Sequence, residues 1–196
     1  NTLVAANEAG VDVIYKMGGA QAIGAFAYGT EMVKKVDKIC GPGNIFVALA
    51  KKAVYGHVSI DSIAGPSEIL VLADETANPK FVAADLLSQA EHGIDSQSIM
   101  ITTSEDMAAK VNAEVERQLA LLPRKEIAEK SLQYSKLIIV KDIDEAVDIT
   151  NEYAPEHLIL AVEDYSKFAE RVVNAGSVFL GNYSCESAGD YASGTN

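Results

Sequence analysis

The sequence predicts an α/β protein with mostly parallel sheets flanked by helices. Short apolar runs rich in β-branched residues alternate along the chain with segments of helical periodicity, as expected for strand–helix–strand units. Glycine closes two of the helical segments, and TSED (103–106) supplies a helix cap followed by acidic residues. The composition is that of a globular protein, since 48% of the 196 residues are hydrophobic and 22% are charged.

The first four elements are expected within residues 11–56. The run VDVIYKM (11–17) predicts a strand, and AQAIGAFAYG (20–29) predicts a helix that ends in glycine. The run KVDKIC (35–40) predicts a second strand, and GNIFVALAKKAVYG (43–56) predicts a helix that again ends in glycine. These segments together form one strand–helix–strand–helix unit.

The rest of the chain continues this alternation. Apolar runs predict five strands, SEILVLAD (67–74), SIMITT (98–103), KLIIV (136–140), HLILAV (157–162) and SVFL (177–180). The segments between them predict helices around 78–91, 104–121, 124–133, 143–153 and 164–174. The break HVSIDSIAGP (57–66) separates two Rossmann-like units, and we place the boundary between residues 1–58 and residues 59–196.

The composition argues against several classes of protein. A net charge of −12 argues against binding to nucleic acid, which depends on Lys and Arg to neutralise phosphates, but it is compatible with a small cation or a metal. The longest apolar run, residues 45–50, is far too short to span a membrane. Cys40 and Cys185 provide no disulfide framework and fit a reducing, cytoplasmic location.

Two glycine-containing turns are candidate ligand-binding loops. GGAQAIGAFAYGT (18–30) and CGPGN (40–44) each follow a predicted strand, and ligands of open α/β sheets lie beyond the carboxyl ends of the strands. Glycines before a helix let backbone N–H groups approach phosphate, but the G-x-G-x-x-G dinucleotide fingerprint is absent, so spacing alone favours a tight strand–helix turn. Asn44 either contacts a ligand or caps the following helix.

Gln89 and His92 are three residues apart near the end of a predicted helix, in the stretch LLSQAEHG (86–93). On a helix this spacing places both side chains on one face, where they could hold a metal together with carboxylates such as Asp190 and Glu186. An isolated pair of this kind is more often structural, and glutamine is an uncommon zinc ligand. The pattern alone therefore favours the structural interpretation.

An adjacent carboxylate and imidazole occur in NEYAPEHLIL (151–160), at Glu156 and His157. Such a pair can transfer protons near neutral pH. Pro155 predicts an extended conformation for Ala154, and neighbours on a strand point to opposite faces. Both side chains therefore reach one site only if the backbone turns there, and a capped strand start is an equally good interpretation.

Seven segments taken together resemble the histidinol dehydrogenase family. They are GGAQAIGAFAYGT, VDKICGPGN, IDSIAGPSEILVLAD, DLLSQAEHG, NEYAPEHL, AGSVFLG and GDYASGTN, in the family's order and approximate spacing. No single segment decides the match, but seven in order are very specific. The resemblance implies a zinc-dependent oxidoreductase that converts L-histidinol through L-histidinal to L-histidine with two NAD, in the last step of histidine biosynthesis.

The resemblance also implies the metal site. In the family the Gln and His of the SQAEHG motif and the Asp of the GDY motif bind one zinc per subunit and contact the substrate, which here means Gln89, His92 and Asp190. The fourth ligand is a histidine downstream of residue 196, from the other subunit of a homodimer. Because a family NAD-contacting Tyr also lies upstream of Asn1, we expect a chain truncated at both ends and inactive alone.

The remaining roles follow from the same resemblance. His157 would contact the substrate and take the alcohol proton as hydride leaves for NAD, and Glu156 would activate the water that hydrates the aldehyde. Ser67 matches a substrate-contacting position. Gln21 and Asn44 match NAD contacts, and this atypical cofactor mode accounts for the missing dinucleotide fingerprint.

One departure from the family pattern lies in NYSCESAGD, where Cys185 replaces the proline of many members and could loosen the loop before Asp190. We reject a thiolate mechanism through Cys185, because the sequence shows no defined activating neighbour. The alternative to an enzyme is a non-catalytic metal- or nucleotide-binding Rossmann-like module, or a scaffold in which every motif is structural. Glu156 and His157 favour an enzyme, since a pure binder does not need two proton-transfer groups.

Overall fold

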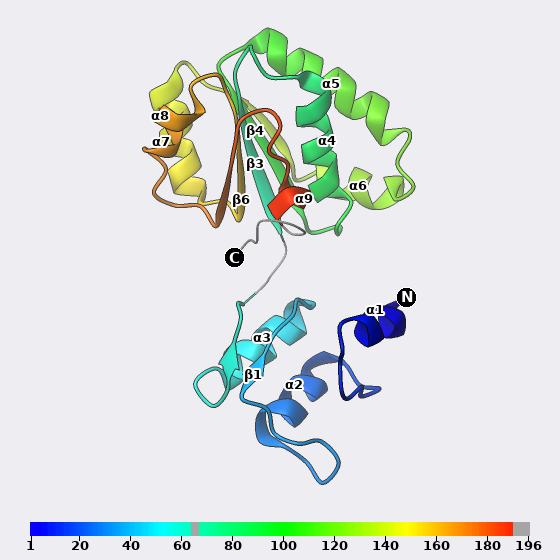
Figure 1. Ribbon diagram of the computed structural model, residues 1–196. Coiled ribbons are helices and arrows are strands. Elements are labelled where there is room, and N and C mark those ends of the chain that lie inside the picture. Colours follow the sequence, from blue (N-terminus) through cyan, green and yellow to red (C-terminus); the bar gives the residue numbers. More distant parts are fainter. Residues whose placement is uncertain (64–66, 190–196) are drawn as a thin grey trace. The chain divides into compact units, whose positions relative to one another are not determined.

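The computed structural model describes residues 1–63 and 67–189, and the chain divides into two compact units, Asn1–Gly65 and Pro66–Asn196 (Figure 1). The division follows Gly65 rather than residue 58, because β2 (Ser59–Ile60) pairs in parallel with β1 (Lys38–Ile39) of the first unit. The predicted α/β class is confirmed, since parallel sheets with flanking helices form both units. No helix in the described ranges is long and apolar enough to cross a membrane.

The first unit packs helices against the two-stranded sheet. Its helices are α1 (Thr2–Glu8), α2 (Gly19–Tyr28) and α3 (Ile45–Val54). α2 ends at Gly29, whose φ of +78° favours glycine, and α3 begins at Asn44, whose side-chain oxygen accepts hydrogen bonds from two backbone N–H groups. A small apolar core joins α2, α3 and the sheet and contains Ile23, Ala27, Ile39, Val54 and Val58.

The strand predicted at 11–17 is wrong. Residues 11–17 are exposed along their whole length and have no regular secondary structure. A strand needs a neighbouring strand to take up its backbone hydrogen bonds, and in the described part of the first unit only β1 and β2 form a sheet, beside an isolated bridge between Tyr55 and Val58. An apolar run without a pairing partner therefore stays irregular. Helix α1, in turn, has no counterpart among the elements that the sequence predicts.

The second unit is built on a five-stranded parallel sheet in the spatial order β5-β4-β3-β6-β7. The strands are β3 (Glu68–Ala73), β4 (Gln97–Thr102), β5 (Lys136–Ile139), β6 (His157–Ala161) and β7 (Ser177–Leu180). The chain starts at the central strand, adds two strands on one side, and then crosses back to add two on the other. This is the strand order of the Rossmann fold.

Helices cover both faces of this sheet (Figure 1). One face carries α4 (Pro79–Ala90), α5 (Glu105–Leu119) and α6 (Lys125–Leu132), and the other carries α7 (Ile143–Tyr153) and α8 (Tyr165–Ala169). β3 serves both cores, because Ile69 and Val71 pack with α4 and α5 whereas Leu70 and Leu72 pack with α7 and α8. Burial on both faces explains why the central strands are continuously apolar.

Side chains define where several helices begin and end. The N-caps of α4, α5 and α7 are Asn78, Ser104 and Asp142, and Ser104 is the cap predicted from TSED. α8 is shorter than the helix predicted at 164–174. The side-chain oxygen of Asn151 accepts a hydrogen bond from the backbone N–H of Val173 at 2.9 Å, and this contact holds the segment after α8 in a non-helical conformation.

The start of β6 is fixed by its backbone contacts with the segment before β7. The N–H of Gly176 donates to the Pro155 carbonyl at 3.0 Å, and the N–H of Ser177 donates to the Glu156 carbonyl at 2.8 Å. A Cβ atom at position 176 would lie only 2.6 Å from the Glu156 carbonyl oxygen. Only glycine therefore allows the two segments to approach this closely.

We expect Gly176→Ala to lower the free energy of unfolding of the intact protein by about 1–3 kcal/mol, the usual range for forced overpacking. The new methyl group must push the Glu156 carbonyl away and break the backbone contacts that begin β6. Denaturant unfolding monitored by circular dichroism measures the change. Gly24→Ala is the matched control, because a Cβ there meets open space inside helix α2, and we expect equal or higher stability. Equal stability of Gly176→Ala and the wild type would contradict the packing argument.

Candidate active site

Glu156 and His157 come together at the amino edge of the second sheet, where β6 begins. The Nε2 atom of His157 lies 3.8 Å from Oε1 of Glu156 and 3.6 Å from Oε1 of Glu186, the first residue of α9 (Glu186–Ala188). The side chains of His157 and Glu186 are 8% and 10% exposed, whereas that of Glu156 is 37% exposed. One imidazole nitrogen thus faces a buried and a solvent-accessible carboxylate.

The backbone turns sharply just before this pair. Ala154 ends helix α7 in the left-handed conformation, with φ of 53° and ψ of 61°, and its N–H donates to the Thr150 carbonyl at 3.0 Å. The predicted extended conformation of Ala154 is therefore wrong, because the left-handed helix ending outweighs the usual preference of a residue before proline. Among the described residues Ala154 is the one non-glycine residue with positive φ, a feature often found at functional sites.

Gln89 lies in the last turn of α4 and is fully buried. Among the described residues, neither its amide oxygen nor its amide nitrogen finds a hydrogen-bond partner. A buried amide without partners costs about 1–3 kcal/mol, so this side chain is suited to a ligand that supplies the missing contacts. The Nδ1 atom of His157 is likewise buried without a partner in the part of the chain that the structure describes.

The sequence predicts that Gln89 and His92 share one helix face, but His92 does not lie on the helix. α4 ends at Ala90, and His92 lies in the turn that follows, with its backbone N–H donating to the Gln89 carbonyl at 3.1 Å. Its side chain is exposed. The turn keeps the two residues adjacent, but it separates a buried amide from an accessible imidazole.

Asp85 is a residue of this region that sequence reasoning missed. It lies on α4 four residues before Gln89, and burial, together with the neighbouring Glu186 carboxylate, raises its pKa to about 7. The i, i+4 spacing of Asp85 and Gln89 was the available sequence signal. Glu186 is a candidate carboxylate from the sequence. In the structure its carboxylate interacts with two groups of the site, the Asp85 carboxyl group and Nε2 of His157.

Further acidic groups make this edge of the sheet negative. Glu68 begins β3, and burial and the Glu156 carboxylate raise its pKa. Burial and Glu68 raise the pKa of Tyr153 to about 12, and the Tyr153 hydroxyl donates a 2.7 Å hydrogen bond to the side-chain oxygen of Gln97. Ser67 directly precedes β3 at the same edge. Carboxylates gathered in this way favour a cationic ligand.

The residues expected to bind zinc can be examined only in part. Within the described ranges, no three His, Cys, Asp or Glu side chains gather closely enough to hold a metal. The expected ligand Asp190 lies outside the described residues. Gln89 and His92 supply one oxygen and one nitrogen donor, and the unpartnered Gln89 oxygen fits a site that a metal would complete.

The expected NAD contacts, Gln21 and Asn44, both belong to the first unit. Gln21 is exposed on α2, and the Asn44 oxygen is engaged in capping α3, so only its amide nitrogen can contact a ligand without breaking the cap. The turn around Gly41 is held by Lys51, whose buried Nζ donates to the Gly41 carbonyl at 2.9 Å and pairs with Asp61. This turn is fixed by the protein's own contacts.

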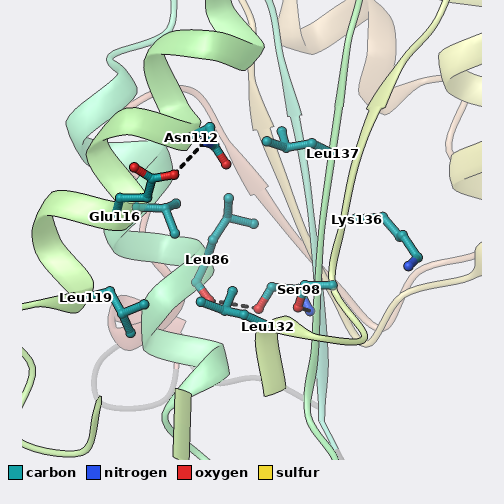
Figure 2. A pocket seen from close by; sticks show the side chains of 10 residues that line it. Leu86, Ser98, Asn112, Glu116, Leu119, Leu132, Lys136 and Leu137 are labelled. Carbon is teal, nitrogen blue, oxygen red and sulfur yellow. Dashed lines mark hydrogen bonds between the residues drawn. The ribbon is translucent and has the colours of Figure 1, made fainter. Parts of the chain in front are cut away.

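A separate cavity of about 320 Å³ lies beside α4, α5, strand β4 and the edge strand β5 (Figure 2). Leu86, Leu119 and Leu132 make it largely apolar, and its polar groups include Asn112, which donates to Glu116 at 3.1 Å. None of the residues proposed from the sequence lines it. The polar amino edge of the sheet, rather than this cavity, is therefore the candidate active site.

The fold and the site together define a Rossmann-like α/β protein with an adjacent carboxylate and imidazole at the amino edge of its second sheet. Cys185 is exposed and precedes α9 with an extended backbone, at φ of −85°. A family model described as histidinol dehydrogenase matches residues 1–196. The chain belongs to the histidinol dehydrogenase family.

Relatives support this assignment over almost the whole chain. Histidinol dehydrogenase from Bacteroides thetaiotaomicron is 66% identical over 195 residues, which is 99% of this chain and 46% of the relative. The corresponding protein of Mannheimia succiniciproducens is 58% identical over 197 residues. The crystal structure of histidinol dehydrogenase from Elizabethkingia anophelis matches with a TM-score of 0.92 and 56% identity, covering 99% of this chain and 45% of that one. The chain thus spans about half the length of these relatives.

More distant structures share the fold alone. Propionaldehyde dehydrogenase from Rhodopseudomonas palustris matches 90% of this chain with a TM-score of 0.57 and 14% identity. An identity this low carries no argument about substrate or mechanism.

The raised pKa of Asp85 predicts a loss of stability with increasing pH. Because the carboxyl group holds its proton more tightly in the folded protein, with a pKa of about 7 against 3.8, stability is full below pH 4 and falls as the pH rises through 7. Because of this group, we expect the free energy of unfolding of the metal-free protein to fall by about 2–4 kcal/mol between pH 4 and pH 8.

Asp85→Asn should remove this part of the pH dependence, and the variant should be more stable than the wild type at pH 8. Urea unfolding between pH 5 and pH 8, after treatment with a chelator, measures it. Asp148→Asn on the exposed face of α7 is the control and should follow the wild-type curve. Parallel curves for wild type and Asp85→Asn would show that Asp85 titrates normally.

Proposed function

We propose that the whole protein is a zinc-dependent dehydrogenase that oxidises L-histidinol through L-histidinal to L-histidine with two NAD, in the last step of histidine biosynthesis. The observation that carries the proposal is the contact between Glu156 and His157 at the edge of the sheet that also holds the unpartnered Gln89 amide. Family membership over all 196 residues supports the same reaction. A cytoplasmic homodimer is the expected form.

The metal would be held by Gln89, His92 and Asp190, with a histidine of the second subunit as the fourth protein ligand. When bound, zinc supplies a Lewis acid to which the imidazole and amino nitrogens of histidinol can bind. The Gln89 oxygen, buried without a partner among the described residues, would gain a contact. The carboxylates at the same edge favour both a metal ion and the substrate's ammonium group.

His157 would act as the base in the first oxidation. Its Nε2 takes the proton of the alcohol while the C–H bond breaks and hydride passes to NAD, giving the aldehyde and NADH. The carboxylates of Glu156 and Glu186 lie 3.8 and 3.6 Å from this nitrogen, so the imidazolium formed in the step meets negative charge. Ser67 at the same edge would contact the substrate.

Glu156 would act in the second oxidation. An aldehyde gives up hydride readily only after water has added to its carbon, and the partly exposed Glu156 carboxylate can take a proton from that water. Hydride then passes from the diol to a second NAD while a hydroxyl proton of the diol is lost to a base, and the carboxylic acid remains. Gln21 and Asn44 of the first unit would contact the nicotinamide cofactor.

We expect His92→Ala to remove zinc and activity together in the intact enzyme, because it deletes one of few protein ligands. Metal analysis after gel filtration and NADH production from histidinol measure the two losses. His57→Ala is the matched control, since His57 packs on Tyr28 in the first unit, 4.7 Å between ring centroids, and should retain both. Full zinc occupancy in His92→Ala would refute its assignment as a ligand.

The two oxidations should respond differently to substitution of the proton-transfer pair. His157→Asn should slow histidinol oxidation by about 10²–10⁴-fold, the usual contribution of a general base. Glu156→Gln keeps the size but cannot take a proton, so it should slow histidinal oxidation more than histidinol oxidation. Single-turnover assays with each substrate separate the steps. If Glu156→Gln slows both steps equally, or the first alone, the division of roles is wrong.

A further inference from the structure

Two carboxylates face the Nε2 atom of His157 at similar distances, but they differ in their surroundings. Glu156 Oε1 is 3.8 Å away on a side chain that is 37% exposed, and Glu186 Oε1 is 3.6 Å away on a side chain that is 10% exposed. A solvated carboxylate can exchange protons with water, whereas a buried one is shielded from water and depends on neighbouring groups of the protein. Their environments therefore suit them to different tasks.

Glu186 is brought to His157 from a distant part of the chain. It is the first residue of α9, after β7, while His157 begins β6, and these two strands pair with His157 beside Ser177. The His157 ring also lies 6.2 Å from that of Phe179 on β7. The ring is thus enclosed by elements whose own hydrogen bonds fix them, and Glu186 is the buried acid among the described groups within ion-pair distance of it.

Burial of a carboxylate is costly unless an opposite charge compensates it. A positive charge on His157 is the natural partner for Glu186, and His157 acquires one when it accepts a proton. Glu186 faces the Nε2 atom, which is the nitrogen that takes the proton, so its negative charge would stabilise the protonated imidazole directly.

We propose that Glu186 acts through His157 as a positioning residue, by stabilising the imidazolium that forms during alcohol oxidation. This inference rests on the proposed function, because it concerns the step assigned to His157. Glu186 acts through His157 and transfers no proton itself. Glu156 keeps the separate role of activating water, for which its exposure suits it.

The proposal is tested in the intact, zinc-loaded enzyme with Glu186→Gln, which keeps the size of the side chain and removes its charge. We expect histidinol oxidation in single turnovers to slow by at least about tenfold, with zinc content and KM for histidinol unchanged. In the His157→Asn background, Glu186→Gln should cause no further loss, because residues that act as a unit are not additive. Glu152→Gln on α7, at an exposed position, is the matched control.

Each outcome has a distinct meaning. If His157→Asn leaves histidinol oxidation intact, the proposed function of His157 fails. If His157→Asn is slow but Glu186→Gln is not, or if the two losses multiply, only the positioning role is overturned. Loss of zinc in Glu186→Gln would also overturn it. Should Glu186→Gln not fold, Glu186→Asp is measured in the same assays. The shorter side chain keeps the negative charge but moves it away from His157, so a wild-type rate would refute the proposal.

Discussion

The backbone contact between the start of β6 and the segment before β7 is the constraint on which the candidate site depends. The Glu156 carbonyl accepts from the Ser177 N–H, the Pro155 carbonyl accepts from the Gly176 N–H, and the Glu156 backbone also bonds to the Glu68 carboxylate of β3. Glu156 and His157 are therefore held from both neighbouring strands. Groups fixed in this way need little reorganisation when a substrate arrives, which is the main source of precision in a proton-transfer site.

The position of the site at the amino edge of the sheet has electrostatic consequences. Ligands of Rossmann folds usually lie at the carboxyl edge, where the positive N-terminal ends of helices face phosphates. At the amino edge the helices end instead, as α4 does beside Gln89, and their partial charge is negative. With Glu68, Glu156 and Glu186 added, this edge favours cations and disfavours a pyrophosphate. Under the proposed function, the cofactor's phosphates must therefore be bound elsewhere.

The sequence predicted the parts of the fold that local patterns determine. All five strands of the second sheet form where apolar runs predict them, because a strand buried on both faces needs a continuous apolar sequence. The run at 11–17 has the same local pattern but finds no pairing partner among the residues that the structure describes, and the left-handed Ala154 is set by the end of α7 rather than by Pro155. Likewise, contacts between distant segments, such as that of Glu186 with His157, leave no trace in local spacing.

The two units differ in whether the polar groups of their candidate ligand sites already have partners within the protein. In the first unit, the buried Lys51 already satisfies the Gly41 carbonyl and Asp61, so the glycine turn is ordered before any ligand binds and binding costs little entropy. In the second unit the Gln89 amide is buried without a partner among the described residues, and this lowers the free energy of unfolding of the ligand-free protein. A ligand that satisfies this amide recovers that energy as affinity. A pre-ordered turn suits a cofactor that must bind and leave in each cycle, whereas an unsatisfied buried donor set suits a resident ion.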